Sequence, residues 1–132
     1  MDASFRLKQV AGGLLRLAEV AVRVERAERA EVIVSEAVFT WRREVYSPNA
    51  RWGGPDDELL IAGAIEGVQY VLDRLDGCDN NYQVTVTKIV DAPADSTFRD
   101  VKFAAVRATC DALGVALSRP PFIDRTGAVF PD

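Results

Sequence analysis

The sequence of 132 residues contains no histidine and only two cysteines. Because histidine is the commonest general base and metal ligand in proteins, its absence removes the usual starting point for acid–base and metal chemistry. Cys78 and Cys110 fit neither a disulfide framework nor a zinc site, and we expect two reduced thiols. The pattern G-x-x-x-x-G-K-[ST] does not occur, which excludes a P-loop GTPase.

The sequence also lacks the segments that direct proteins to membranes. No apolar run approaches the roughly 20 residues that a transmembrane helix requires. The opening residues Met-Asp-Ala-Ser are not the basic leader of a signal peptide. We therefore expect a cytoplasmic protein with no membrane partner.

What is present is the ordinary balance of a globular domain, with 48% hydrophobic and 27% charged residues. The length allows one domain with a real core. We assign residues 1–114 to a single α+β domain and residues 115–132 to an extended tail that is free to add an edge strand. The net charge of -4 argues against a general nucleic-acid binder, although it leaves room for a local basic patch.

The clearest pattern is a strand followed by a short acidic turn. Apolar and polar residues alternate from Tyr82 to Val90, which predicts a half-buried strand with Lys88 and Ile89 as its exceptions. The side chains expected on the buried face are those of Tyr82, Val84, Val86 and Val90.

A helix is expected directly after that turn. Ser96 or Thr97 has the hydroxyl of an N-cap residue, and Asp100 stands where it can complete a capping box with Thr97. Apolar residues then recur at helical spacing as far as Ala112. Gly114 is expected to end the helix.

The N-terminal part reads as extended structure. Residues 5–13 are expected to form a short extended segment that ends in a turn at Gly12-Gly13. Alternation over residues 18–25 and again over residues 30–39 predicts two strands. Because the link between them is short and polar, we expect an antiparallel pair.

A further helix is expected between these strands and the strand that starts at Tyr82. Asp56 or Asp57 is the expected N-cap, and residues 77–81 are expected to end the helix. Gly63 and Gly67 lie on neighbouring turns and predict close approach of another backbone, for which we expect the sheet. The helix is expected to run to about Leu75. Its apolar stripe consists of Leu60, Ala64, Gly67, Val68, Val71 and Leu75. The order of elements predicts an α+β fold, with helices on one face of a largely antiparallel sheet.

Aromatic residues and arginines gather in residues 40–54, where the strand pattern breaks. Such residues stack on nucleic-acid bases and dominate protein–protein hot spots, so this cluster is the leading candidate for a binding surface. The alternative is that the tryptophans cover an open sheet edge and the arginines are solvated. The cluster consists of Trp41, Arg42, Arg43, Tyr46, Arg51 and Trp52.

Two other groups carry weaker signals. The region of the Gly12-Gly13 turn has the composition of a small anion-binding tip, but a glycine pair before a strand is also ordinary turn chemistry. Its polar members are Lys8, Gln9 and Arg16. Several carboxylates suggest metal or acid–base chemistry, but turn and capping roles explain them as well. They are Asp56, Asp57, Glu58, Asp91 and Asp95. We expect no enzymatic activity, metal or cofactor.

Several landmarks resemble domain IV of bacterial elongation factor G. In that family a K-Q-x-G-G turn precedes a long valine-rich strand. Here Lys8-Gln9 and Gly12-Gly13 precede residues 18–24 in the same order, with one extra residue in the turn.

The resemblance continues to about residue 113. The family has a Gly-Gly pair followed, thirteen residues after its second glycine, by a helix glycine, and Gly54 and Gly67 have that spacing. The family's D-V-K-V-T-L strand is similar to residues 83–88. Its D-S-S-x-x-A-F-K-x-A helix start is similar to residues 95–104.

The resemblance implies the two-layer fold of that domain, which ribosomal proteins also use. That fold has a four-stranded, mostly antiparallel sheet with two helices on one face and a left-handed strand–helix–strand crossover. It also implies a ribosome- or translation-associated binding role.

Two departures bear on that role. The family's loop before the D-S-S helix carries a histidine and reaches the decoding region of the ribosome, whereas residues 91–95 form a shorter loop with two carboxylates that would repel phosphates. Leu14 stands where the family has an arginine. Two hypotheses remain open: a module that binds the ribosome or an associated protein, and a protein-interaction or homo-oligomerising domain that has lost RNA contact.

Overall fold

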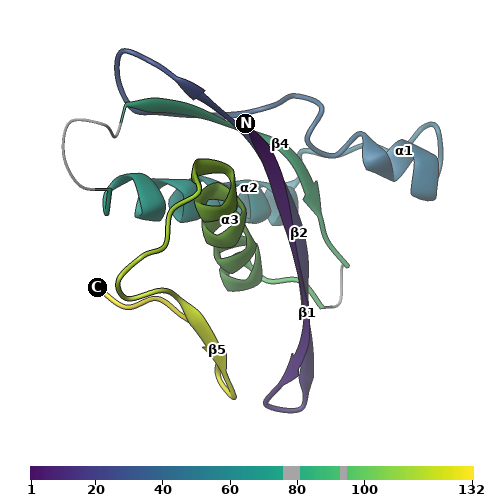
Figure 1. The fold of residues 1–132 in the computed structure, drawn as a ribbon. Helices are drawn as coiled ribbons and strands as arrows, with labels where there is room; N and C mark the ends of the chain where they lie inside the picture. The colour runs from purple at the N-terminus through teal and green to yellow at the C-terminus, as the bar shows by residue number, and fades with distance from the viewer. Residues whose placement is uncertain (76–80, 93–94) are drawn as a thin grey trace.

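The computed structural model of the chain describes residues 1–75, 81–92 and 95–132, and Figure 1 shows its course. In chain order the elements are β1 (Asp2–Ala11), β2 (Leu14–Arg26), β3 (Glu31–Val34), α1 (Trp41–Val45), α2 (Pro55–Leu72), β4 (Tyr82–Val90), α3 (Phe98–Leu113), β5 (Phe122–Asp124) and β6 (Gly127–Val129). The fold is α+β, as the sequence predicts. The helix α2 ends at Leu72 with Asp73 as its C-cap, before the expected end at about Leu75. Residues 77–81, which we expected to end it, lie almost wholly outside the described residues.

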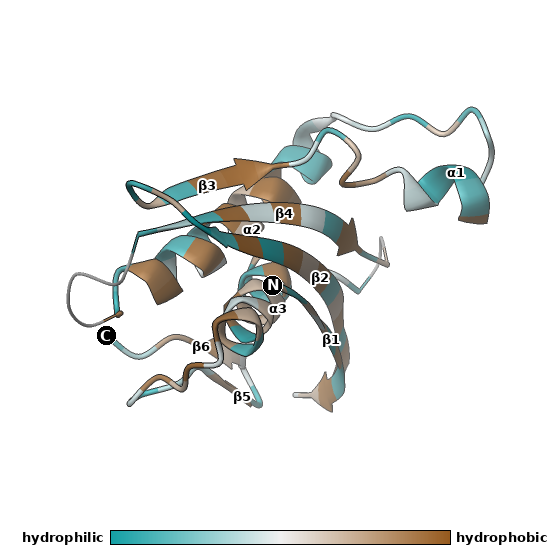
Figure 2. Ribbon diagram, turned by 45° about the horizontal axis from the view of Figure 1, so that its top comes forward, coloured by the Kyte–Doolittle hydropathy of each residue, from teal (hydrophilic) through white to brown (hydrophobic). Residues whose placement is uncertain are grey.

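Four strands form one mixed sheet in the order β1-β2-β4-β3. β2 is antiparallel to both of its neighbours, β1 and β4, while β3 runs parallel to β4. Figure 2 shows α2 and α3 beneath the same face of this sheet, and side chains from that face and from both helices form one apolar core. The handedness of the β3–α2–β4 crossover stays a prediction.

The N-terminal half departs from the expected pairing. The short extended segment that we expected at residues 5–13 is instead part of the ten-residue strand β1, which pairs along its whole length with β2. Gly12 and Gly13 have φ angles of 62° and 78°, which a two-residue hairpin turn of this kind requires. The expected antiparallel partner of β2, residues 30–39, yields only the four-residue β3, which pairs with β4. β2 already has a neighbour on each side, so the predicted pair was wrong.

A bulge explains why the alternation fails near the end of β4. The pairing register shifts between Ala21 and Val22 of β2, which leaves Thr87 as an extra residue on β4. Beyond the bulge the side chains change face. Ile89 is fully buried, whereas Val90, which we expected on the buried face, is only partly buried.

The helix α3 begins and ends as predicted. The Thr97 hydroxyl accepts a hydrogen bond from the Asp100 backbone N–H, and the Asp100 carboxylate accepts one from the Thr97 N–H. This reciprocal pair is a capping box. Gly114 ends the helix in the left-handed conformation, with φ at 67°.

The helix α2 begins differently from the prediction. Its N-cap is Gly54, and neither Asp56 nor Asp57 caps it. Pro55 occupies the first helical position, where its fixed φ suits a helix and its missing N–H costs no hydrogen bond. The carboxylate of Asp57 instead accepts a hydrogen bond from the backbone N–H of Gly53, at 3.0 Å.

Two glycines let α2 approach α3 closely. A Cβ on Gly63 would lie 2.6 Å from the carbonyl oxygen of Phe98, and a Cβ on Gly67 would lie 2.5 Å from that of Lys102. The predicted backbone approach is therefore confirmed. Its expected partner, the sheet, was wrong, because the backbone and the small side chain of Ala105 on α3 fill these positions.

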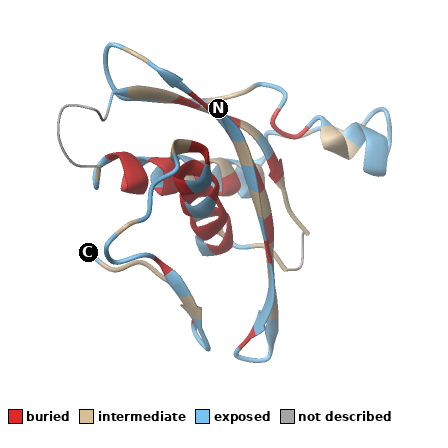
Figure 3. Cartoon of the chain, in the orientation of Figure 1, coloured by how far each residue is buried: buried red, intermediate tan, exposed pale blue. Residues whose placement is uncertain are grey.

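Residues 115–132 do not add an edge strand to the large sheet. β5 and β6 pair with each other in a separate hairpin. A small apolar cluster of Leu7, Phe103 and Ala128 joins this hairpin to β1 and α3. Figure 3 shows that burial is concentrated in α2, α3 and the strands facing them, whereas α1 is largely exposed. Within the described ranges, no helix has both the length and the apolar character needed to cross a bilayer.

Candidate functional site

The aromatic–arginine cluster lies on a segment that stands out from the rest of the molecule. We call residues 40–54 the arm; in Figure 1 its helix α1 projects beside the sheet at the right of the view. None of the α1 residues is buried. The Trp41 indole N–H donates a hydrogen bond to the carbonyl oxygen of Ile89, at 2.6 Å. The Trp41 side chain therefore fixes the start of the arm to β4, and Trp52 near the other end packs against the apolar core.

An ion triad provides the second attachment of the arm. The Arg42 guanidinium lies 2.9 Å from the Asp57 carboxylate and 2.7 Å from the Asp91 carboxylate. The three side chains are only 11%, 14% and 10% exposed. Burial lowers the pKa of Arg42, but the hydrogen bonds to Asp91 and Asp57 outweigh it and raise the pKa above its ordinary value. Arg42 is thus a permanent cation.

Three separate elements bring the triad together. Arg42 comes from α1, Asp57 from the first turn of α2, and Asp91 directly follows β4. The guanidinium of Arg42 also lies over the ring of Phe39, 4.0 Å from its centroid. Asp57 in addition holds the arm at Gly53, so one carboxylate fixes both ends of the arm.

A cavity of about 680 Å³ opens beside the triad. The first turns of α2 and α3 form part of its wall, and the arm forms another part. The residues that line it are Arg42, Tyr46, Ala50, Arg51, Asp56, Asp57, Leu59, Leu60, Asp91, Ser96, Thr97 and Phe98. The structure therefore gathers three of the six cluster residues and three of the predicted carboxylates around one cavity.

The rim of this cavity is exposed and chemically mixed. Tyr46 and Leu59 are 58% and 57% exposed, and Arg51 is exposed as well. On the arm, the guanidinium of Arg43 lies over the ring of Trp52, 4.9 Å from its centroid. Sequence reasoning named the aromatic and cationic members but missed Leu59, an apolar residue on the solvent side of α2.

The predicted anion-binding tip is divided between two faces of the β1–β2 hairpin. Lys8 is exposed and pairs with Leu17, whereas Gln9 pairs with Arg16 on the opposite face. Arg16 lies under the C-terminal hairpin, with its guanidinium next to Gly127. The tip residues therefore do not converge on one ligand.

Among the residues that the structure describes, the other predicted carboxylates and Cys110 do not form a second reactive cluster. Glu58 is exposed on the first turn of α2, and the backbone N–H of Asp95 donates to the carbonyl oxygen of Ala92. Burial raises the pKa of the Cys110 thiol within α3, which disfavours the reactive thiolate. Cys78 lies outside the described residues.

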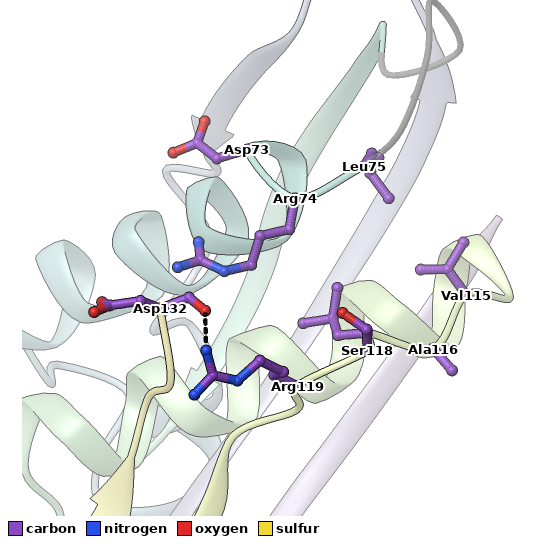
Figure 4. Close-up of a pocket in the computed structure, with 9 residues that line it drawn as sticks. Asp73, Arg74, Leu75, Val115, Ala116, Ser118, Arg119 and Asp132 are labelled. Atoms are coloured by element: carbon purple, nitrogen blue, oxygen red, sulfur yellow. Dashed lines mark hydrogen bonds between the residues drawn. The ribbon is translucent and has the colours of Figure 1, made fainter.

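A second cavity, of about 590 Å³, lies where α2 and α3 end. Figure 4 shows the side chains of Arg74 and Arg119 directed toward Asp132. Arg74 donates hydrogen bonds to the carbonyl oxygens of Tyr70 and Pro131, and Arg119 donates one to that of Asp132. Both arginines therefore fasten the C-terminal segment, and the triad cavity is the better candidate for a partner.

Comparison with known proteins gives a fold relationship only. No family model matches the sequence, and no curated protein matches it. The chain is similar to a solved structure, the crystal structure of a protein from Thermus thermophilus, with a TM-score of 0.58 over 82% of this chain. The two sequences are 15% identical, and the matched region is 14% of that protein's chain. At this level of identity the similarity shows that the fold is shared.

Proposed function

We propose that this chain is a non-enzymatic binding module of the elongation factor G domain IV type, and that it binds a protein through the arm and the rim of the triad cavity. The observation that carries the proposal is an exposed aromatic, aliphatic and cationic rim held in place by a nearly buried ion triad. Tyrosine and arginine are frequent hot-spot residues. A surface that is already fixed before binding loses little conformational entropy when a partner docks.

Charge favours a protein partner over RNA. Residues 40–58 together with Asp91 carry three arginines and five carboxylates, so the surface has a net charge of 3 − 5 = −2. Of the two arginines that line the cavity, Arg42 is neutralised by its two aspartates. A site for a phosphate backbone would carry excess positive charge instead.

Two exposed aliphatic residues on one helix provide the test. Leu59 lines the triad cavity, whereas Ile65 is 39% exposed further along α2 and does not line it. The immobilised chain and its Tyr46→Ala, Leu59→Ala and Ile65→Ala variants are each used to capture proteins from the native lysate. We expect one partner to be lost with the first two variants and retained with Ile65→Ala. Equal capture by all four proteins would reject the arm as the binding surface.

A ribosomal target is the second candidate, and it rests on the resemblance to domain IV together with the exposed Lys8 and Gln9 at the β1–β2 tip. That resemblance also predicts a left-handed β3–α2–β4 crossover. Nuclease treatment of the lysate separates the two candidates. Capture that survives nuclease supports a protein partner, whereas capture that is lost with nuclease and with Lys8→Glu supports the ribosomal target.

A further inference from the structure

The strand β1 forms an open edge of the large sheet. It is ten residues long, its register with β2 is continuous, and its sequence contains no proline. Edge strands that are long and regular are templates for pairing with another chain. The opposite edge, β3, has only four residues. Among the described strands, β1 is therefore the edge best suited to accept a further strand.

The direction of its backbone groups can be derived from one residue pair. Met1 and Val24 exchange both backbone hydrogen bonds, at 2.7 and 3.0 Å. Because hydrogen-bonded pairs alternate along an antiparallel ladder, the odd-numbered residues of β1 bond to β2. The even-numbered residues Asp2, Ser4, Arg6 and Lys8 then direct their N–H and C=O groups to the open edge. All four side chains are exposed.

The charges on this edge are complementary to themselves in one register. When two β1 strands run antiparallel with Phe5 opposite Phe5, Asp2 of each copy faces Lys8 of the other and Ser4 faces Arg6. A shift that places Arg6 opposite Arg6 sets like charges against each other, which destabilises a strand pair. A shift in the other direction brings Asp2 opposite Arg6 but shortens the ladder by two pairs.

We infer that two copies of this chain associate by antiparallel pairing of their β1 strands in the register that places Phe5 opposite Phe5. The dimer joins two four-stranded sheets into one. The ladder uses residues 2–8 and leaves free the β1–β2 turn, where the carbonyl of Arg125 sits against Gly12. It is independent of the arm and of the function proposed for it.

The association is expected to be weak. A seven-residue ladder buries a surface at or below the low end of stable protein interfaces. Arg107 of α3 lies over the ring of Phe5, 4.6 Å from its centroid. Because Phe5 lies at the two-fold axis of the dimer, each copy also brings a cation toward that axis. We expect a dissociation constant on the order of 10 µM, and tighter association at low salt.

Sedimentation velocity over a dilution series from about 1 to 300 µM tests the dimer, since that range spans the expected dissociation constant. The wild-type chain should pass from monomer to dimer. Asp2→Lys and Lys8→Asp should each weaken the dimer about tenfold, because each replaces two attractive cross-strand pairs with repulsive ones. The double variant D2K/K8D should restore it. Glu31→Lys, an equal charge change on β3, is the matched control and should leave the dimer unchanged.

Ser4→Pro supplies a variant that does not depend on charge. It removes an N–H that faces the open edge and is not used within the monomer, so thermal stability should be largely kept while the dimer is lost. A wild-type chain that stays monomeric over the whole range overturns the inference. A dimer that survives Ser4→Pro overturns it as well. Rescue of Asp2→Lys by Arg6→Asp instead of Lys8→Asp overturns the register.

Discussion

The contact between α2 and α3 and the attachment of the arm are built by opposite means. The helices meet where side chains are missing, at Gly63 and Gly67, and bury apolar surface over their length. The arm has a five-residue helix with no buried residue. Polar contacts hold most of it, namely the Trp41 indole hydrogen bond, the Arg42 triad and the Gly53–Asp57 hydrogen bond, and Trp52 alone packs against the core.

The difference teaches where this molecule can tolerate change. The helix contact depends on shape, so any added atom meets backbone that cannot move independently. The arm depends on a few polar partners, so loss of one partner leaves buried charge behind. A change at the triad therefore lowers stability through uncompensated charge, whereas a change at the helix contact lowers it through overlapping atoms.

The largest effect is expected at the helix contact. Gly67→Val places atoms where the Lys102 carbonyl and the Ala105 methyl already lie, and should lower the free energy of unfolding by about 3 kcal/mol or more. Gln69→Val, at an exposed position on the same helix, should cost less than about 1 kcal/mol through helix propensity. Denaturant unfolding measures both variants. Similar losses in the two would mean that close packing is not the cause.

Arg42→Met should lower the free energy of unfolding nearly as much. It leaves Asp57 and Asp91 close together with little access to water, and breaking a buried ion pair costs about 3 kcal/mol. Arg23→Met is the control, because its partner Asp2 and Arg23 itself are mostly exposed, and an exposed pair contributes less than about 1 kcal/mol. Adding Asp57→Asn and Asp91→Asn to Arg42→Met should recover much of the loss. No recovery would contradict the electrostatic account of the arm.

A smaller effect is expected from Trp41→Phe. The phenyl ring retains most of the apolar contact but cannot donate to the Ile89 carbonyl, and losing one such bond costs about 1 kcal/mol. Limited proteolysis of residues 40–54 measures the loosening of the arm more directly than global unfolding does. Trp52→Phe, which keeps a ring in contact with Arg43 and the core, should raise the cleavage rate less than Trp41→Phe does.

The smallest effect concerns pH. Burial raises the pKa of Asp100, although hydrogen bonds from Thr97 oppose the shift. A carboxyl with a raised folded-state pKa contributes stability below its unfolded pKa and loses it as pH rises through the folded pKa. Asp100→Asn keeps an oxygen for the Thr97 N–H, so the variant should gain stability relative to wild type as pH rises above the unfolded pKa of about 4. A difference in urea unfolding that stays constant as pH rises would exclude such a titration.

The candidate site shows what sequence patterns can and cannot supply. Arg42, Asp57 and Asp91 were all named from the sequence, but in two unrelated groups, as an aromatic–arginine cluster and as turn or capping carboxylates. They come from three elements separated by up to 49 positions. Their contact depends on how β4 and α2 pack, which no local pattern contains. Leu59 was missed because a single exposed leucine is common on any helix.

The sequence by itself determined the features that depend on neighbours within a few residues. Local hydrogen bonds determine both ends of α3, the capping box at Thr97 and the C-cap at Gly114. Side-chain alternation determines the strand from Tyr82 to Val90.

Tertiary structure alone decided which strand pairs with which. It placed β4 between β2 and β3, and it gave the helix glycines a helix as their partner. It also gathered the three charges of the triad. The physical reason is that strand pairing, close packing and buried ion pairs join residues far apart in the chain, and their energies depend on the whole arrangement rather than on any one segment.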